Sequence, residues 1–406
     1  MLKRKPQKYI LPLTVLGFSL MLPACASLSN LSDAVQSLGS SILGNNSESE
    51  PPAPLTEYDI EVELDVIWKE SIGVGKDKKY LKLNIALSSD NIFVADREGL
   101  VQARSASNGD LLWESTTSYS FSAGPGLGID NLILGTSNAE VVAFNRSSGE
   151  ELWKTTVSSE VLAVPVISKG VVIIRTTDGR IIALNETDGL QLWSFEKNVP
   201  ALTIRGTGKP LVLDNQVIAG YANGKLLSLD LKTGKNNWET TLAIPSGRSE
   251  VERLVDLDSD PVESDGVVYI SSYNGGTTAV SIDNGNPLWR NEDLSAYTGL
   301  TISRRYIFLS DAKSDVWELE KRNGGTLWKQ EALHYRSLTS PIAYDNYVVV
   351  GDYDGYVHWL SRTDGRLLNR IKIADAAIDS NPVVVNDIIY IYAKDGTLAA
   401  LRARLF

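Results

Sequence analysis

The chain has 406 residues, a formal net charge of −11 and an isoelectric point of about 4.9, and it contains one cysteine and two histidines. An acidic surface repels phosphate backbones, which argues against nucleic-acid binding. A single cysteine excludes a disulfide within the chain. His334 and His358 form no cluster in the sequence for a metal site or a nucleophilic triad, so the composition favours a non-enzymatic protein with no cofactor.

Residues 1–24 are predicted to be a secretory signal peptide. Four basic residues precede an uncharged apolar run over residues 9–22, which is shorter than the roughly 20 residues that cross a bilayer as a helix. The Leu-Pro-Ala-Cys sequence that ends at Cys25 resembles a bacterial lipobox, so Cys25 is the predicted lipidation site. Alanine rather than aspartate at position 26 implies export to the outer membrane.

Residues 25–57 are predicted to form a lipidated, flexible tether. They are rich in Ser, Asn and Pro and cannot bury enough apolar area to fold. Loss of residues 1–24 removes four positive charges and takes the formal charge from −11 to −15, so membrane attachment should depend on the lipid. The apolar spacing within residues 28–42 leaves a short amphipathic helix open as an alternative.

From residue 58 to residue 406 the chain repeats one unit of about 40 residues. Tryptophans recur at intervals of 40, 40, 45, 51 and 39 residues, and a glycine stands four positions before each of them. The tryptophans are Trp113, Trp153, Trp193, Trp238, Trp289 and Trp328. A seventh copy keeps Gly365 but has Asn369 in place of the tryptophan. A second glycine lies 14 positions before most aligned positions, as in Gly275, but Ala139 and Ser314 replace it in two copies.

Each unit predicts four antiparallel strands, the pattern of a propeller blade. Residues 171–184 predict a hairpin around Asp178-Gly179, because this dipeptide supplies the positive φ of a tight turn. The last copy has no outer strand, and residues 65–70, with Trp68, supply one from the start of the domain. We therefore expect an all-β, eight-bladed propeller of four-stranded antiparallel blades whose ring is closed by an N-terminal outer strand. The recurring tryptophans are interpreted as packing between blades rather than as a ligand cage.

Two other features have structural interpretations. His358 stands next to Trp359 in a strand pattern, where a structural hydrogen bond is favoured over a ligand role. Asp256, Asp258 and the aspartate at position 260 alternate like the start of a calcium loop, but proline and valine stand where that loop requires glycine and glutamate. We therefore predict no metal site.

Two neighbouring units are longer than the rest, by five and eleven residues. Both insertions are expected in the connection that enters the next blade, on the face that bears the Asp-Gly turns. Residues 199–206 and 252–258 then form a candidate binding patch, because insertions in repeat proteins map to functional loops. Apolar side chains next to charges are typical of an interface, and here they are Leu202, Ile204, Arg205, Arg253, Asp256 and Asp258. Loops that only pack on themselves are the alternative.

The lipobox, residues 202–206, residues 252–258 and Leu338-Thr339-Ser340-Pro341 together resemble the BamB family of propeller lipoproteins, over essentially the whole chain. That family belongs to the outer-membrane β-barrel assembly machinery of Gram-negative bacteria. The resemblance implies a non-catalytic scaffold on the periplasmic face that docks on the POTRA domains of BamA and assists the insertion of β-barrel proteins, with unfolded precursors as further partners. By position, it implies docking through Leu202, Ile204, Arg205, Asp256 and Asp258; Ile204 stands where leucine is more usual.

The blade repeats also resemble those of pyrroloquinoline-quinone alcohol dehydrogenases. Those enzymes are longer and carry an adjacent cysteine pair over the cofactor, which a chain with one cysteine lacks. A periplasmic quinone-dependent dehydrogenase-like protein and a propeller that binds cell-wall polysaccharide are the two alternative functions.

Overall fold

The computed structural model describes residues 50–405 except Ser89, residues 198–199, residues 201–207, Gly247 and residues 250–251. The described residues form strands and turns. Among these residues no helix is long and apolar enough to cross a membrane.

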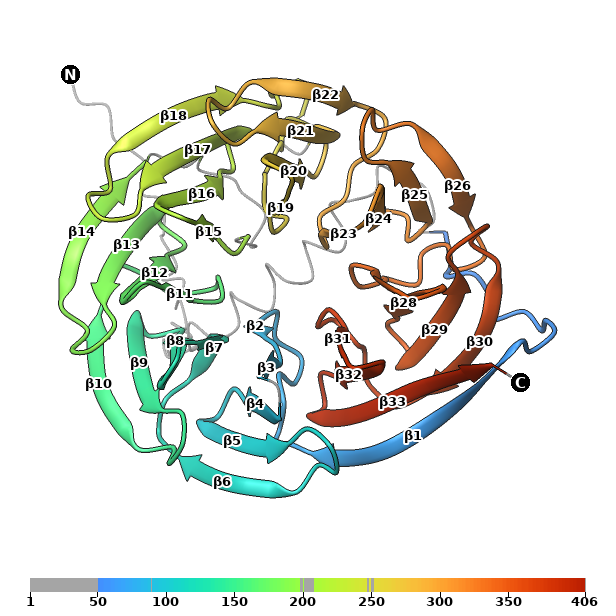
Figure 1. Ribbon diagram of the computed structural model, residues 1–406, viewed down its shortest axis with the longest axis horizontal. Coiled ribbons are helices and arrows are strands. Elements are labelled where there is room, and N and C mark those ends of the chain that lie inside the picture. The colour runs from blue at the N-terminus through green and yellow to red at the C-terminus, as the bar shows by residue number, and fades with distance from the viewer. Residues whose placement is uncertain are drawn as a thin grey trace, which may run out of the picture. The chain divides into compact units, whose positions relative to one another are not determined.

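Eight blades, each built from four antiparallel strands, follow one another around a ring (Figure 1). In ring order the first four contain β3 (Ala86–Leu87), β4 (Asn91–Ala95), β5 (Leu100–Ser105) and β6 (Leu111–Thr116); β7 (Phe121–Leu127), β8 (Asn131–Thr136), β9 (Glu140–Asn145) and β10 (Glu151–Thr156); β11 (Val166–Ser168), β12 (Val171–Arg175), β13 (Arg180–Asn185) and β14 (Gln191–Glu196); and β15 (Leu211–Leu213), β16 (Gln216–Gly220), β17 (Lys225–Asp230) and β18 (Asn236–Thr241).

The other four sheets contain β19 (Val262–Ser264), β20 (Val267–Ser271), β21 (Thr277–Ser281) and β22 (Pro287–Asn291); β23 (Leu300–Ser303), β24 (Tyr306–Ser310), β25 (Val316–Glu320) and β26 (Thr326–Gln330); β27 (Ile342–Tyr344), β28 (Tyr347–Gly351), β29 (Tyr356–Ser361) and β30 (Leu367–Lys372); and β31 (Val383–Val385), β32 (Ile388–Tyr392), β33 (Thr397–Leu405) and β1 (Val62–Ser71). The prediction of an eight-bladed propeller is confirmed.

The ring closes through β1, as the sequence predicts. β1 pairs antiparallel with β33 from Val62 opposite Leu405 to Ser71 opposite Thr397. Trp68 on β1 then reaches the next blade, where its indole nitrogen donates to the Ala106 carbonyl over 3.0 Å. Both ends of the described chain therefore contribute to one blade.

One short strand was not predicted. β2 (Lys82–Leu83) pairs in parallel with β7 and makes a fifth strand in that sheet. The chain must cross from the outer strand β1 to the innermost strand β3, and on the way its backbone bonds to β7, the innermost strand of the blade that follows the one containing β3. Two residues carry no periodicity that could predict this pairing.

The repeated tryptophans and glycines form one contact between consecutive blades. A Cβ atom added to the glycine would lie 2.4–2.8 Å from the indole ring of the preceding blade, at Gly109, Gly149, Gly189, Gly234, Gly285, Gly324 and Gly365. Each indole nitrogen also donates to a carbonyl of the following blade over 2.9–3.1 Å. The structural interpretation of the tryptophans is confirmed.

Asn369 departs from this pattern because the next blade lacks the glycine turn. In that blade β33 runs to the end of the described chain and β1 comes from its beginning, so no turn joins the two strands. The Asn369 side chain instead donates to the Val62 carbonyl over 2.8 Å. At this position the next blade offers no turn glycine for a tryptophan ring to pack against, and the asparagine amide bonds to the backbone of β1 instead.

Two details of the turns and the domain boundary differ from expectation. Ala139 and Ser314 adopt φ values of +60° and +67°, so they take the left-handed conformation of the glycine that they replace. In the β20–β21 hairpin the residue with positive φ is Gly276 rather than Gly275. The predicted tether reached residue 57, but the chain already contacts the propeller at Ala53.

Candidate docking face

The described ends of the two long connections contact each other where they enter their blades. The first joins β14 to β15 and the second joins β18 to β19. The backbone nitrogen of Lys209 donates to Asp260 Oδ1 over 2.7 Å, and a Cβ on Gly208 would lie 2.6 Å from the Ser259 carbonyl oxygen. The predicted site residues Leu202, Ile204 and Arg205 in the first connection lie outside the described residues.

The second connection is held over the turns of two neighbouring blades. Leu257 donates its backbone N–H to the Tyr221 carbonyl over 3.3 Å, at the turn between β16 and β17. Tyr273, in the turn between β20 and β21, donates to the Asp256 carbonyl over 3.1 Å. These turns are the predicted Asp-Gly-type turns, so the connection lies on the face where the sequence places it. We call this face of the propeller the turn face.

The second connection presents an apolar residue and a charge to the solvent. Ile244 is 74% exposed, a high value for a large aliphatic side chain. Arg253 is exposed, whereas Val255 and Leu257 are buried against the blades. Two backbone N–H groups donate to the Glu252 carboxylate, and these hydrogen bonds hold its pKa below the usual range. The exposed part of this loop has the composition of an interface.

Asp256 and Asp258 lie below this surface. They are 1% and 8% exposed, although the sequence placed them in a loop expected to be exposed. They are buried because the loop fits between two blades, which sequence spacing does not reveal. Burial raises the pKa of Asp258 to about 7, while the nearby Arg175 charge lowers it and Asp256 raises it. Asp258 Oδ2 accepts no hydrogen bond from the part of the chain that the structure describes.

Arg175 is a residue of this region that the sequence analysis missed. It ends the apolar strand β12 and is buried. Its guanidinium donates to the Gly208 carbonyl over 3.1 Å and lies 5.2 Å from the ring centre of Tyr221. It thus connects the first long connection to a turn that the second one contacts. The signal available in the sequence was an arginine that directly follows four apolar residues in a predicted strand.

The charge on Asp258 should destabilise the fold at neutral and alkaline pH. Because its folded pKa is raised above the usual value of about 3.9, the folded state holds a proton that the unfolded state has lost, and stability increases as the pH falls from above 7 towards 4. We expect Asp258→Asn to raise the free energy of unfolding at pH 8 by on the order of 2 to 4 kcal/mol, and by much less at pH 4.5. Urea denaturation at the two pH values measures this, and an equal effect at both would contradict it.

The histidines and the aspartate alternation have structural explanations. His358 is fully buried and its Nε2 lies 2.9 Å from Asp352 Oδ2, which confirms the predicted structural hydrogen bond. Burial lowers the pKa of His358, although Asp352 opposes this effect. Among the residues that the structure places, no three acidic, histidine or cysteine side chains come together in an arrangement that could hold a metal ion.

A cavity of about 310 Å³ opens beside this region. Its lining includes Asp258 and Lys209 together with Tyr80, Lys82 and Tyr297. The cavity thus brings carboxylate, ammonium and phenol groups from distant parts of the chain together, and the sequence analysis did not identify it.

The chain is similar to known proteins over most of its length. Residues 97–330 and 329–404 match the family model described as outer membrane protein assembly factor BamB. The protein of that description from Pseudomonas aeruginosa is 46% identical over 374 residues, which cover 91% of this chain and 98% of the relative. The crystal structure of BamB from Moraxella catarrhalis matches with a TM-score of 0.77 and 28% identity, over 84% of this chain and 100% of that one.

A quinohemoprotein alcohol dehydrogenase from Comamonas testosteroni also shares the architecture. It matches with a TM-score of 0.66 and 12% identity, over 84% of this chain and 77% of that one. At this identity the similarity shows the fold alone.

Proposed function

Since the chain belongs to the BamB family of outer membrane protein assembly factors, we propose that it is a scaffold lipoprotein that binds the POTRA domains of BamA and assists the insertion of β-barrel proteins. Its role lies in outer membrane protein assembly, and it is not an enzyme, because its relatives over nearly the whole chain are assembly factors. Unfolded barrel precursors are a second class of partner in this proposal.

The observation that carries the proposal is the contact between the two long connections on the turn face. Unequal repeat lengths and the family resemblance indicate the same two loops independently. Ile244 and Arg253 supply an apolar anchor and a charge on that face. In the proposal Leu202, Ile204 and Arg205 contact the partner, whereas the buried Asp256 and Asp258 act through their charge below that surface.

The same proposal places the protein on the periplasmic side of the outer membrane, with residues 1–24 removed and a lipid on Cys25. Cys25 and the rest of residues 1–49 lie outside the described residues. The support is the lipobox sequence and the association of the named relatives with outer membrane assembly.

Arg205→Glu should abolish docking without affecting the fold. Reversal of a charge at the centre of an interface replaces attraction with repulsion, a loss of about 2 to 5 kcal/mol if the charge is buried in the complex. That loss turns a micromolar complex into one too weak to isolate. The first measurement is co-purification with BamA from detergent-solubilised outer membranes. Thermal melts provide the second, and the free energy of unfolding should change by less than about 0.5 kcal/mol.

The matched control is Lys232→Glu. Lys232 is exposed in the turn between β17 and β18, at the opposite face of the propeller from the two long connections. This variant has the same charge change and should retain BamA. If Arg205→Glu retains BamA as well as Lys232→Glu does, the interface lies elsewhere.

A further inference from the structure

Residues 50–61, which we call the strap, lie along the outer strand β30, where Figure 1 shows the segment before β1 at the rim of the propeller. Backbone hydrogen bonds hold the strap near both ends. Ala53 donates to the His334 carbonyl over 2.9 Å, and Glu61 donates to the Leu368 carbonyl over 3.1 Å. These residues belong to the segment that the sequence assigned largely to a free tether, so their docking requires an explanation.

Three arginines of the neighbouring blades contact the strap in succession. Arg336 donates to the Ala53 carbonyl over 3.1 Å. Arg370 donates to the Thr56 carbonyl over 2.6 Å, and its guanidinium lies 5.2 Å from the Tyr58 ring centre. Arg366 binds both carboxylate oxygens of Glu61 over 2.8 and 2.7 Å. A paired arginine–carboxylate contact of this kind fixes the orientation as well as the position of the chain.

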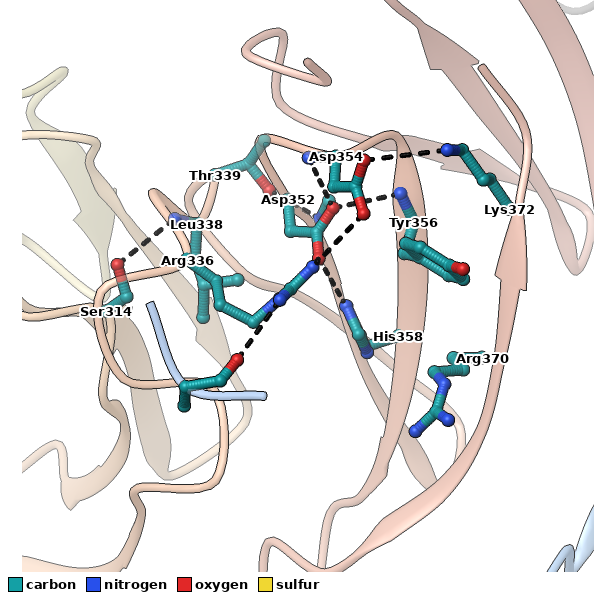
Figure 2. A network of polar contacts seen from close by, with 12 residues as sticks. Ser314, Arg336, Leu338, Thr339, Asp352, Asp354, Tyr356, His358, Arg370 and Lys372 are labelled. Atoms are coloured by element: carbon teal, nitrogen blue, oxygen red, sulfur yellow. Dashed lines mark hydrogen bonds and ion pairs between the residues drawn. The ribbon is translucent and has the colours of Figure 1, made fainter. Parts of the chain in front are cut away.

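The first of these arginines is itself held in place. Figure 2 shows the Arg336 guanidinium pointing at Asp352, whose Oδ2 lies 2.8 Å from its Nε and 2.7 Å from its Nη2. The same oxygen lies 2.9 Å from His358 Nε2, and Asp352 Oδ1 accepts the Tyr356 N–H over 2.9 Å. Arg336, Asp352 and His358 are all buried. The position that receives Ala53 is therefore preformed, and the strap does not need to order it.

An apolar contact completes the docking. Leu55 is partly buried and packs against a cluster that includes Leu333 and Leu338. Leu333 lies in the connection between β26 and β27, as does Arg336. Contacts of the strap backbone, its charges and its apolar side chain thus converge on one blade junction.

The strap has a defined direction. Its Ala53 end lies at the turn face, because the Arg336 carbonyl accepts the N–H of Tyr353, in the turn between β28 and β29. Its Glu61 end lies at the opposite face, beside Arg366 in the turn before β30. The strap therefore begins at the face that carries the two long connections.

We propose that the strap fixes the exit point of the N-terminal segment, so that the lipid anchor and the docking loops act from the same face of the propeller. This inference rests on the proposed lipidation of Cys25. A flexible segment from residue 25 to residue 50 has a root-mean-square span of roughly 27 Å, far below its fully extended length of about 90 Å, so the anchor stays near the exit point and the face at that point is favoured for approach to the bilayer. Its partner is the lipid surface to which Cys25 is attached, and the turn face is the side of the propeller presented towards it.

The first test is hydrogen exchange of the full-length protein. The amides of Ala53 and Glu61 should exchange at least about tenfold more slowly than the same amides in a peptide of residues 50–61. Leu55→Asp places a charge against the apolar cluster and should remove the protection at Ala53, while Leu192→Asp, an exposed leucine on β14, should leave it unchanged. Exchange at peptide rates in the wild type would overturn the inference.

The second test measures orientation on a membrane. A dye is attached to a new cysteine in the lipidated protein, either Lys313→Cys in the turn between β24 and β25 or Arg322→Cys in the turn between β25 and β26. Both side chains are exposed and belong to one blade, but they lie at opposite faces. On phosphatidylcholine vesicles with an acceptor dye in the headgroups, energy transfer should be at least twofold greater from position 313, and Leu55→Asp should reduce this ratio.

Equal transfer from the two positions, or greater transfer from position 322, would overturn the inference. Failure of the protein to bind these vesicles would instead contradict the lipid anchor of the proposed function. The exchange measurement would then decide by itself whether the strap is docked. The BamA co-purification is independent of both tests, so a failed docking reaction can be distinguished from a free strap.

Discussion

A variant that lacks residues 62–70 should lose most of its stability or fail to fold. The deletion removes β1 from its pairing with β33, which leaves that strand with an unpaired edge in the blade that closes the ring. It also removes Trp68, which is 8% exposed and packs in the apolar cluster with Phe93 and Tyr390. Loss of a buried tryptophan alone destabilises a fold by about 3 to 5 kcal/mol, and a domain has only about 5 to 15 kcal/mol in total.

The comparison is made by thermal and urea denaturation followed by circular dichroism. Deletion of residues 26–49 is the control, because the sequence assigns them to the tether and the propeller begins after them. We expect that control to melt within a degree or two of the wild type. Trp68→Ala should fall between the two variants. If both deletions melt at the same temperature, closure by β1 does not stabilise the ring.

Gly189→Ala should destabilise the propeller far more than Gly170→Ala. The two glycines have similar backbone conformations, with φ of +71° and +79°. A Cβ on Gly189 would lie 2.4 Å from the Trp153 ring and 2.6 Å from Thr155 Oγ1, whereas a Cβ on Gly170 meets nothing within 4 Å. Both variants carry the strain of a left-handed alanine, about 1 to 2 kcal/mol. Only Gly189→Ala also forces the blades apart, which adds about 1 to 3 kcal/mol.

Urea denaturation of the two variants measures the difference. A double variant, Trp153→Ala with Gly189→Ala, provides a further check, because removal of the indole should relieve the clash and make the two effects non-additive. Equal destabilisation by Gly189→Ala and Gly170→Ala would mean that the tryptophan contact does not constrain this position.

The amino-acid sequence by itself determined the blade, the number of blades and the strand that closes the ring. These features depend on local rules repeated many times: a glycine at the positive-φ position of most of the aligned turns, runs of apolar residues in the strands between them, and a tryptophan four residues after a glycine. Because the unit is repeated eight times, the pattern in one copy supports the strand assignment in the others. The adjacency of the two long loops followed as well, because connections that occupy the same place in each blade emerge on the same face.

Only the tertiary structure decided how residues distant in the sequence share space. Asp256 and Asp258 looked like surface residues of a polar loop, but two blades enclose them. Asn369 looked like an irregular copy, but it faces a blade without the glycine turn and pairs with Val62, which comes from the other end of the domain. Residues 50–57 of the strap looked like part of a tether from their composition, yet Arg336 and Arg370, about 300 positions away, bind Ala53 and Thr56. Burial and charge pairing depend on the neighbours that folding brings together, and the pattern of a single segment contains no record of those neighbours.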